Sequence, residues 1–420
     1  MKTTTQKLQD SWVHVPENSD FPIQNLPYGI FQTEKRGASV GVAIGEQILV
    51  LEEVARLGFF DDLNIDTSVF SSSSLNNFIS LGKKNWTAVR QKLTELLDSE
   101  NDALQSFKTD VLVEMADAEM LLPVEIGDYT DFYSSIEHAT NVGTMFRGAD
   151  NALMPNWKHL PVGYHGRASS IVVSGTDIHR PKGQTLAAEA DTPEFGPSKR
   201  MDFELEMAFI IGKNTELGET VSTENAEDHI FGMVVFNDWS ARDIQKWEYV
   251  PLGPFLGKNF ASSISPWIVT MDALEPFRVE SPTQDPKPLP YLQYEGNKSY
   301  DINLSVAIAP ENSEETVVCN SNFKYMYWTM AQQLTHHTVN GCNIRVGDMM
   351  ASGTLSGSTP DSFASMLELS WAGQKEVPLS NGETRKFLRD GDTVVMSAHC
   401  QKGDLRVGFG EVRSKLLPSR

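Results

Sequence analysis

Cysteine is scarce in this chain of 420 residues, since Cys319, Cys342 and Cys400 are its only three and none lies in a CxxC pair. An odd number of widely spaced thiols fits a reducing cytosol and argues against a disulfide framework and a zinc site. Apolar runs are also short, none approaching the roughly 18 residues of a transmembrane helix. The first six residues, MKTTTQ, do not resemble a signal peptide. We therefore expect a cytoplasmic protein without a membrane partner.

Positive charge is in short supply as well. The chain has 35 Lys and Arg against 56 Asp and Glu, which gives a formal net charge of −21. This imbalance argues against binding to nucleic acid or to anionic membranes, and an anionic substrate would need cations close to its site. The 40% hydrophobic and 22% charged content is ordinary for a soluble globular protein, and the length favours two domains.

Several nucleotide-binding and catalytic motifs are absent. The chain has no GxGxxG after a strand, no HExxH, no EF-hand loop and no GxSxG elbow. The segment 253–259 is one residue short of a P-loop, and 353–357 places its serine at the wrong offset for the elbow. NAD chemistry, ATP hydrolysis and serine acyl transfer are therefore disfavoured.

The order of the patterns predicts a small N-terminal α+β domain over 1–118 and a larger domain over 119–420. Helical spacing occurs at 86–97 and 321–337, and Ser134 with Glu137 forms a capping-box pattern that would start a third helix. Strand-like runs recur in the larger part, at 170–173, 203–211, 231–236, 267–270, 366–371 and 393–396. Strands outnumber helices, so we predict a β-rich α+β fold.

Four carboxylates lie in short, otherwise apolar stretches. Within 203–211 apolar residues alternate with acids, so Glu204 and Glu206 should share one strand face, about 7 Å apart. Asp131 lies in DFY and Asp238 between Phe236 and Trp239. A solvent-facing pair is one explanation. If the acids converge, each like-charge pair at 4 Å costs about 4 kcal/mol, which a hard cation such as calcium or magnesium would relieve.

Further functional side chains lie close to these acids in sequence. His138 falls in the first turns of the capped helix, where the positive helix end should keep it neutral and able to accept a proton. Arg242, Gln245 and Tyr249 follow Asp238 at helical spacing, and Lys258 stands in a glycine-containing turn. Glu368 is a single acid in the apolar run 366–371, so it needs a partner; orienting a histidine or forming a plain salt bridge are the two alternatives.

Five runs carry a resemblance to a known family. They are DYTDFYSS at 128–135, HATNVG at 138–143, PVGYHGR at 161–167, FNDWSARDIQ at 236–245 and SMLELSW at 365–371. With them the chain resembles the fumarylacetoacetase family over nearly its whole length. The resemblance implies an SH3-like N-terminal barrel, a large mixed β-sandwich roll and a homodimer.

The resemblance also implies roles for individual residues. The calcium ligands would be Asp131, Glu204, Glu206 and Asp238, with magnesium or manganese as alternative ions. His138 would be the general base, Glu368 its orienting partner, and Arg242, Gln245 and Lys258 the group that holds the oxyanion. Substrate contacts would come from Tyr133, Arg147, Tyr164, Arg242, Gln245, Tyr249 and Thr354. A second, magnesium-type site would involve Asp238, Lys258 and Ser262, where the family has a threonine.

The implied reaction is metal-dependent hydrolysis of a carbon–carbon bond in 4-fumarylacetoacetate, which gives fumarate and acetoacetate in the last step of tyrosine and phenylalanine breakdown. The metal would stabilise the enolate leaving group. Two other functions stay open. Relatives with the same acidic core hydrolyse acylpyruvates, decarboxylate oxaloacetate or hydrate 2-keto acids. A non-enzymatic protein stiffened by calcium would bind carboxylates without converting them.

Overall fold

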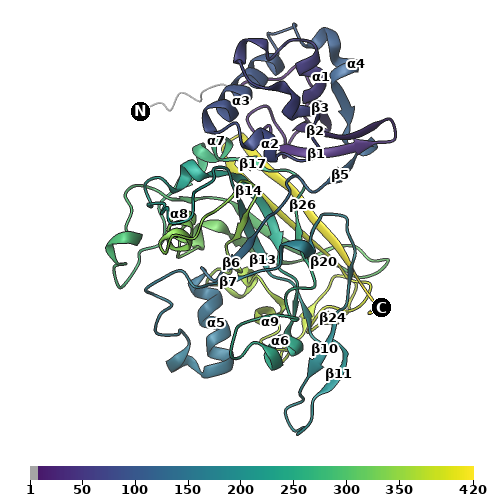
Figure 1. Ribbon diagram of the computed structural model, residues 1–420. Coiled ribbons are helices and arrows are strands. Elements are labelled where there is room, and N and C mark those ends of the chain that lie inside the picture. The colour runs from purple at the N-terminus through teal and green to yellow at the C-terminus, as the bar shows by residue number, and fades with distance from the viewer. Residues whose placement is uncertain (1–7) are drawn as a thin grey trace.

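A computed structural model describes residues 8–420, so the predicted absence of a signal peptide, which rests on the first six residues, lies outside the described part. The N-terminal part forms a separate lobe above a larger, strand-rich part (Figure 1). Across the described residues, no helix has both the length and the apolar character needed to span a bilayer.

The N-terminal lobe contains a five-stranded sheet in the order β4-β3-β2-β1-β5. Its strands are β1 (Tyr28–Thr33), β2 (Arg36–Ile44), β3 (Gln47–Val50), β4 (Leu112–Glu114) and β5 (Glu119–Leu121). Its helices are α1 (Leu51–Arg56), α2 (Asn76–Ile79), α3 (Lys83–Leu97) and α4 (Lys108–Val111). The helix predicted at 86–97 is confirmed, with Trp86, Val89, Leu93, Leu96 and Leu97 buried. The SH3-like barrel and the boundary at 118 stay predictions.

An eight-stranded mixed sheet forms the centre of the larger part, with the main order β7-β6-β22-β13-β14-β16-β8 and β17 paired to β14. Its strands are β6 (Tyr129–Phe132), β7 (Gly163–His165), β8 (Ile171–Val173), β13 (Leu205–Ile211), β14 (Ile230–Asn237), β16 (Ser262–Ile264), β17 (Val269–Thr270) and β22 (Met349–Ala351). The sheet brings strands from distant parts of the chain together, so residues near 131, 206 and 238 can meet at one end.

A second sheet has five strands in the order β21-β20-β25-β26-β9. Its strands are β9 (Ile178–His179), β20 (Asn303–Ala309), β21 (Thr316–Asn322), β25 (Thr393–Lys402) and β26 (Leu405–Leu417). Two-stranded pairs complete the strands: β10 (Lys182–Thr185) with β11 (Glu194–Pro197), β12 (Met201–Asp202) with β15 (Ser240–Ala241), β18 (Arg278–Val279) with β19 (Ser299–Tyr300), and β23 (Val377–Pro378) with β24 (Thr384–Arg385). The β-rich α+β class is thereby confirmed.

Both faces of strand β13 are buried. Leu205, Met207 and Phe209 belong to the core of the larger part, whereas Ala208 and Ile210 belong to a core shared with the N-terminal lobe. Because side chains alternate along a strand, Glu206 lies on the face of Ala208 and Ile210. The solvent-facing explanation of the acids is therefore wrong for Glu206, whose exposed fraction is 0%.

The remaining helices are α5 (Ile136–Arg147), α6 (Arg242–Glu248), α7 (Met271–Leu274), α8 (Met330–Thr338) and α9 (Met366–Leu369). Three expectations need correction. The predicted strand at 366–371 is the short helix α9, because the Ser365 side chain accepts from the Glu368 N–H and caps it. The helix predicted over 321–337 begins only at Met330, capped by Thr329. The third helix is capped by Ser135 and not by Ser134.

Candidate active site and metal centre

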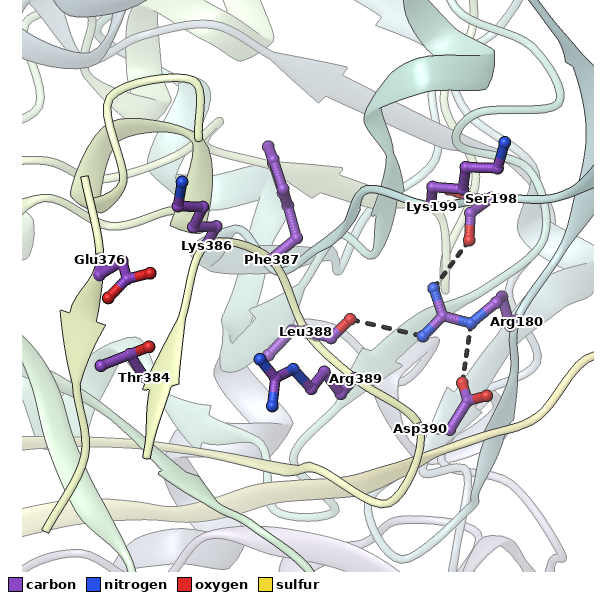
Figure 2. A pocket seen from close by; sticks show the side chains of 10 residues that line it. All are labelled: Arg180, Ser198, Lys199, Glu376, Thr384, Lys386, Phe387, Leu388, Arg389 and Asp390. Atoms are coloured by element: carbon purple, nitrogen blue, oxygen red, sulfur yellow. Dashed lines mark hydrogen bonds and ion pairs between the residues drawn. The ribbon is translucent and has the colours of Figure 1, made fainter. Parts of the chain in front are cut away.

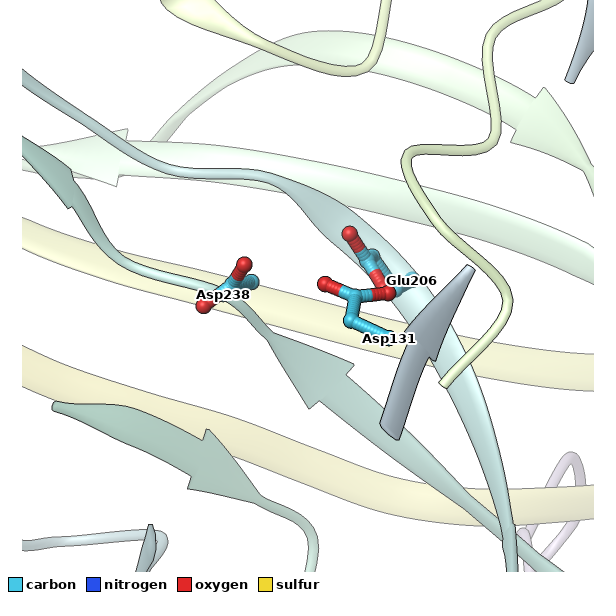
Figure 3. A group of neighbouring side chains, drawn as sticks. All are labelled: Asp131, Glu206 and Asp238. Carbon is cyan, nitrogen blue, oxygen red and sulfur yellow. The ribbon is translucent and has the colours of Figure 1, made fainter. Parts of the chain in front are cut away.

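Three of the predicted acids meet at one end of the eight-stranded sheet. Asp131 lies on β6, Glu206 lies on β13, and Asp238 directly follows β14. One oxygen of each carboxylate lies within 4.8 Å of the others, and all three side chains are buried. Figure 3 shows the three carboxylates facing a common space. The sheet topology thus produces the convergence that the sequence predicted.

The chemistry of these oxygens fits a hard divalent cation. Asp131 Oδ1 and Glu206 Oε1 are buried without a hydrogen-bond partner among the described residues. Burial raises the pKa of Asp131 well above its usual range, and the neighbouring Asp238 raises it further. Burial and the charge of Asp131 do the same for the pKa of Glu206. Buried, unpaired acidic oxygens are costly, and a divalent cation would satisfy them.

Glu204, the fourth predicted ligand, lies beside this group and is held by two cations. Its carboxylate accepts from Lys258 Nζ and, at 2.7 Å, from Arg242 Nη2. Burial opposes ionisation of Glu204, but Lys258 and Arg242 together outweigh it, so the pKa is lowered. Glu204 is therefore an ionised acid, and Lys258, which also donates to Asp238, connects it to the three convergent carboxylates.

Three hydroxyl groups surround the convergent acids. Tyr164 donates to Asp238 Oδ2 at 2.8 Å, and Ser262 donates to Asp238 Oδ1 at 3.3 Å. Tyr129 donates to Asp131 Oδ2 at 3.1 Å. Lys258 Nζ also lies 2.6 Å from Asp238 Oδ2, so the predicted trio of Asp238, Lys258 and Ser262 does come together.

His138 and Glu368 form a buried pair on the other side of the site. His138 Nδ1 lies 2.7 Å from Glu368 Oε2, and the exposed fractions of the two residues are 3% and 1%. A proton on Nδ1, shared with the carboxylate, leaves Nε2 as the atom able to accept a proton. Burial opposes ionisation of Glu368, yet His138 and the hydrogen bonds from Asn141 and Ser356 lower its pKa. The pair has the geometry of a base with its orienting carboxylate.

Two serine side chains that cap the starts of α5 and α9 position this pair. Ser135 accepts from the N–H of His138 at 3.2 Å, which fixes the first turn of α5. Ser365 does the same for Glu368 at 3.3 Å and also donates to its Oε2 at 2.9 Å. Helix caps of this kind satisfy N–H groups that have no partner within the helix. Figure 1 shows α5, α6 and α9 gathered at the end of the larger part that lies away from the N-terminal lobe.

A cavity of about 790 Å³ joins the two groups. It is a size typical of small-molecule sites. Twelve of the predicted residues line it, namely Asp131, Tyr133, His138, Arg147, Tyr164, Glu204, Glu206, Arg242, Gln245, Tyr249, Lys258 and Thr354. Asp238 and Glu368 lie behind the wall and contact its residues Lys258 and His138, and Ser262 contacts Asp238. The sequence prediction thus identified a set of side chains around one cavity.

The turn before Lys258 packs closely against α6. A Cβ atom on Gly257 would lie 2.7 Å from Cα of Gln245, so the missing side chain permits this packing. This close approach positions Gln245 and Lys258 beside each other. At the mouth, Arg147 donates to the carbonyls of Asn151 at 3.2 Å and Ala152 at 2.6 Å, while Tyr249 is 50% exposed.

Sequence reasoning missed several supporting residues. Asn141 donates to Glu368 Oε1 at 2.9 Å, and its spacing of three residues from His138 on one helix was a usable signal. Asp202, fully buried, accepts from Arg242 Nε at 2.7 Å. It precedes Glu204 by two residues, the same alternation that singled out Glu206. Ser356, which donates to Glu368 Oε2 at 2.8 Å, carried no signal of this kind.

A second cavity, of about 510 Å³, contains none of this chemistry. Figure 2 shows that Arg180 crosses it, joined to Asp390 and to the backbone of Ser198 and Leu388. Lys199, Lys386 and Arg389 also line it, and the group of three acids described above lies elsewhere. None of the predicted site residues lines this cavity. It is a structural junction near the base of the β10–β11 hairpin.

Two family models and several curated proteins match this chain over most of its length. The family model described as "Fumarylacetoacetate (FAA) hydrolase C-terminal" matches residues 129–416, and "Fumarylacetoacetase N-terminal" matches residues 24–123. The chain is 57% identical over 415 residues to the fumarylacetoacetase of Caenorhabditis elegans, covering 97% of this chain and 99% of that protein. It is 55% identical over 416 residues to that of Homo sapiens, again covering 97% and 99%.

Solved structures share the fold at low sequence identity. A fumarylacetoacetate hydrolase from psychrophilic Exiguobacterium antarcticum aligns with a TM-score of 0.53 and 19% identity, covering 94% of this chain and all of that one. A maleylpyruvate hydrolase from Sphingobium sp. SYK-6 aligns with a TM-score of 0.51 and 14% identity over the same shares. At such identities the likeness shows a common fold.

Proposed function

Because this chain belongs to the fumarylacetoacetase family, we propose that it hydrolyses the carbon–carbon bond of 4-fumarylacetoacetate to fumarate and acetoacetate, the last step of tyrosine and phenylalanine breakdown. One observation carries the residue-level proposal. A single cavity joins three convergent carboxylates, a buried histidine–glutamate pair and three side chains that can donate to an oxyanion. Neither a purely structural calcium site nor a carboxylate-binding module needs a histidine held by a buried acid.

Water activation falls to His138. Its Nε2 accepts a proton from a water molecule in the cavity, while Glu368 holds the ring in place through Nδ1 and stabilises the imidazolium that forms. General base catalysis by a positioned side chain typically contributes about 10²–10⁴-fold. Asn141, Ser356 and Ser365 keep the Glu368 carboxylate fixed, because each donates one hydrogen bond to it.

The attacked carbonyl develops a negative oxygen, and Arg242, Gln245 and Lys258 are the donors that stabilise it. Gln245 Oε1 accepts from Arg242 Nη1 at 3.2 Å, which leaves the amide N–H groups of Gln245 free for the substrate. Burial disfavours charge on Arg242 and Lys258, but the acids Glu204, Asp202 and Asp238 beside them raise both pKa values above their usual range. Both side chains therefore stay cationic during the reaction.

The ion would be held by Asp131, Glu206 and Asp238, with Glu204 as the fourth ligand. Calcium is our first choice, and magnesium or manganese would suit the same all-oxygen set. A divalent cation bound there supplies Lewis-acid stabilisation of negative charge on the diketone oxygens. A second, magnesium-type site beside Asp238, Lys258 and Ser262 is supported by the contacts among these three residues.

The substrate carboxylates and oxygens would meet Tyr133, Arg147, Tyr164, Tyr249 and Thr354, all of which line the cavity. The hydroxyl of Tyr164 donates to Asp238, which places this side chain beside the proposed metal ligands. Arg147 bonds only backbone carbonyls in the hydrogen bonds described for it, which leaves its charge available for an anionic group.

We further propose a cytoplasmic homodimer with an SH3-like N-terminal barrel. Exposed apolar side chains near the cavity mouth support self-association, since Val250, Leu252 and Phe255 have exposed fractions of 65%, 96% and 61%. Sedimentation of the purified protein at micromolar concentration tests this, and a monomer would contradict it.

The activity test follows the loss of diketone absorbance on fumarylacetoacetate, with oxaloacetate and an acylpyruvate as competing substrates, with and without a chelator. Chelator-sensitive turnover of fumarylacetoacetate, much faster than of the other two, is the expected result. Faster turnover of oxaloacetate or the acylpyruvate would favour the chemistry of the smaller relatives. No turnover on any of the three would favour a binding module.

A further inference from the structure

Asp202 connects two parts of the site that the chain supplies from distant positions. Its Oδ2 accepts from Arg242 Nε at 2.7 Å and from the N–H of Leu367 at 2.9 Å. Its Oδ1 accepts from the N–H of Met366 at 2.6 Å. The exposed fraction of Asp202 is 0%, so water does not compete for these bonds.

Arg242 and the start of α9 belong to different parts of the proposed active site. Arg242 opens α6 and is one of the oxyanion donors. Met366 and Leu367 are the first two residues of α9, and the third is Glu368, which holds His138. The N–H groups at the start of a helix have no partner within it, and Ser365 satisfies only that of Glu368. Asp202 satisfies the other two, so it fixes the turn that carries Glu368.

We propose that Asp202 is a positioning residue, which ties Arg242 and the start of α9 to one buried carboxylate so that the oxyanion donor and the carboxylate behind His138 keep a fixed relative geometry. Asp202 is not among the residues that line the cavity, so it acts through its partners and not on the substrate. The inference rests on the proposed function for its catalytic consequence.

The geometry makes the charge of Asp202 essential. Three N–H donors converge on two oxygens, an arrangement that a carboxylate accepts fully. In Asp202→Asn one oxygen becomes an NH₂ donor that faces another donor, so at least one partner must move. Small displacements of catalytic groups are costly, because catalysis depends on their preorganisation.

A matched control exists elsewhere in the larger part. Asp392 is equally buried, with an exposed fraction of 1%; its two oxygens lie 2.8 Å from Arg385 Nε and Nη2. It also accepts from the N–H of Arg389 at 2.8 Å. None of these residues lines the catalytic cavity. Asp392→Asn therefore reports the general effect of neutralising a buried aspartate that pairs with arginine.

The test measures kcat and KM for Asp202→Asn, Asp392→Asn, Arg242→Gln and the double variant Asp202→Asn/Arg242→Gln, each corrected for its folded fraction. We expect Asp202→Asn to lower kcat about 10²-fold, as loss of one oxyanion donor does, with Asp392→Asn within threefold of wild type. The double variant should lose at least tenfold less than the product of the single losses, because both changes disable the same donor. A multiplicative double variant, or a normal kcat in Asp202→Asn, would overturn the proposal.

Hydrogen exchange of the Met366 and Leu367 amides provides a readout that does not depend on activity. Exchange of both should accelerate in Asp202→Asn and stay unchanged in Asp392→Asn. If wild-type protein shows no turnover, the proposed function fails, while this measurement still tests whether Asp202 fixes the start of α9. Unchanged amide exchange in Asp202→Asn would contradict this positioning role even in an active enzyme.

Discussion

His138 is held between a helix cap and the Glu368 carboxylate, and its free ring nitrogen faces the cavity. His138→Ala should lower kcat by about 10²–10⁴-fold, because water then has no base positioned to take its proton. Metal affinity should not change, since His138 is not part of the carboxylate group. Steady-state kinetics and calorimetric titration with calcium measure the two quantities.

His229→Ala serves as the control for this variant. His229 is also buried, with an exposed fraction of 7%, but its Nδ1 lies 3.1 Å from the carbonyl of Lys213, outside the cavity. We expect it to keep kcat. Near wild-type turnover by His138→Ala would remove His138 from the role of base.

Glu368 should also stabilise the fold in a pH-dependent way. Its pKa is lowered in the folded protein, so between the folded and unfolded values the folded state binds fewer protons than the unfolded state, and acid favours unfolding. The stability advantage of wild type over Glu368→Gln should be full above about pH 4.3 and should shrink as the pH falls through the lowered pKa. Urea unfolding of both metal-free proteins between pH 3 and 7 measures this, and an advantage that grows in acid would contradict it.

The residues around the cavity and the contact between His138 and Glu368 could be predicted from the sequence and its family resemblance, but the division of the four acids into two groups could not. Alternation within 203–211 placed Glu204 and Glu206 on one face, yet only the structure shows that Glu206 joins Asp131 and Asp238 while Glu204 turns to Lys258 and Arg242. That division depends on where α6 and the turn at 257–258 pack. No local pattern reports packing between segments so far apart along the chain.

Helix α6 and the turn that carries Lys258 are packed in van der Waals contact because residue 257 has no side chain. Gly257→Ala would place a Cβ 2.7 Å from Gln245 Cα and 2.8 Å from its backbone N, so one of the two segments must move. Overpacking of this kind typically costs about 1–3 kcal/mol of stability. We also expect kcat to fall at least tenfold, because Gln245 and Lys258 lie on the two displaced segments.

Gly196→Ala is the matched control, since a Cβ at position 196 on β11 would meet no atom within 4 Å. Thermal unfolding and steady-state kinetics on both variants test the difference. Equal stability and equal turnover of Gly257→Ala and wild type would show that the close packing does not position these donors.

Among the secondary-structure elements, the errors occur at a short helix and at helix starts. The run 366–371 was predicted to be a strand because it is apolar, and its capping serine at 365 was overlooked; α9 is short, so its period is hard to distinguish from a strand. The predicted cap of α5, Ser134, lies one residue before the observed cap, Ser135, because both serines are suitable caps. The long helix α3 has four turns of regular apolar spacing, and its prediction was confirmed.

For the chain as a whole, the charge of −21 opposes the approach of a dianionic substrate. Salt screens such repulsion, with a screening length of about 10 Å at 0.1 M. The value of kcat/KM should therefore rise between low and moderate concentrations of potassium chloride, whereas kcat should change little. A fall with salt would show instead that cations at the mouth, such as Arg147 and Lys246, dominate the approach.

The β-rich class was correctly predicted because it follows from strand-like runs that the chain itself contains. The packing of the N-terminal lobe against the central sheet was not predicted, since it depends on residues such as Phe231 and Ile268 that contribute to a core shared with that lobe. This packing buries the face of β13 that carries Ala208 and Ile210, which is also the face of Glu206.

Titration of metal-stripped protein with calcium, with turnover of fumarylacetoacetate measured at each step, tests the account most directly. We predict no turnover before metal is added and full recovery as the site formed by Asp131, Glu206 and Asp238 fills, with Asp131→Asn/Glu206→Gln showing neither tight binding nor recovery. Full turnover by protein that elemental analysis shows to be free of divalent metal would contradict the account.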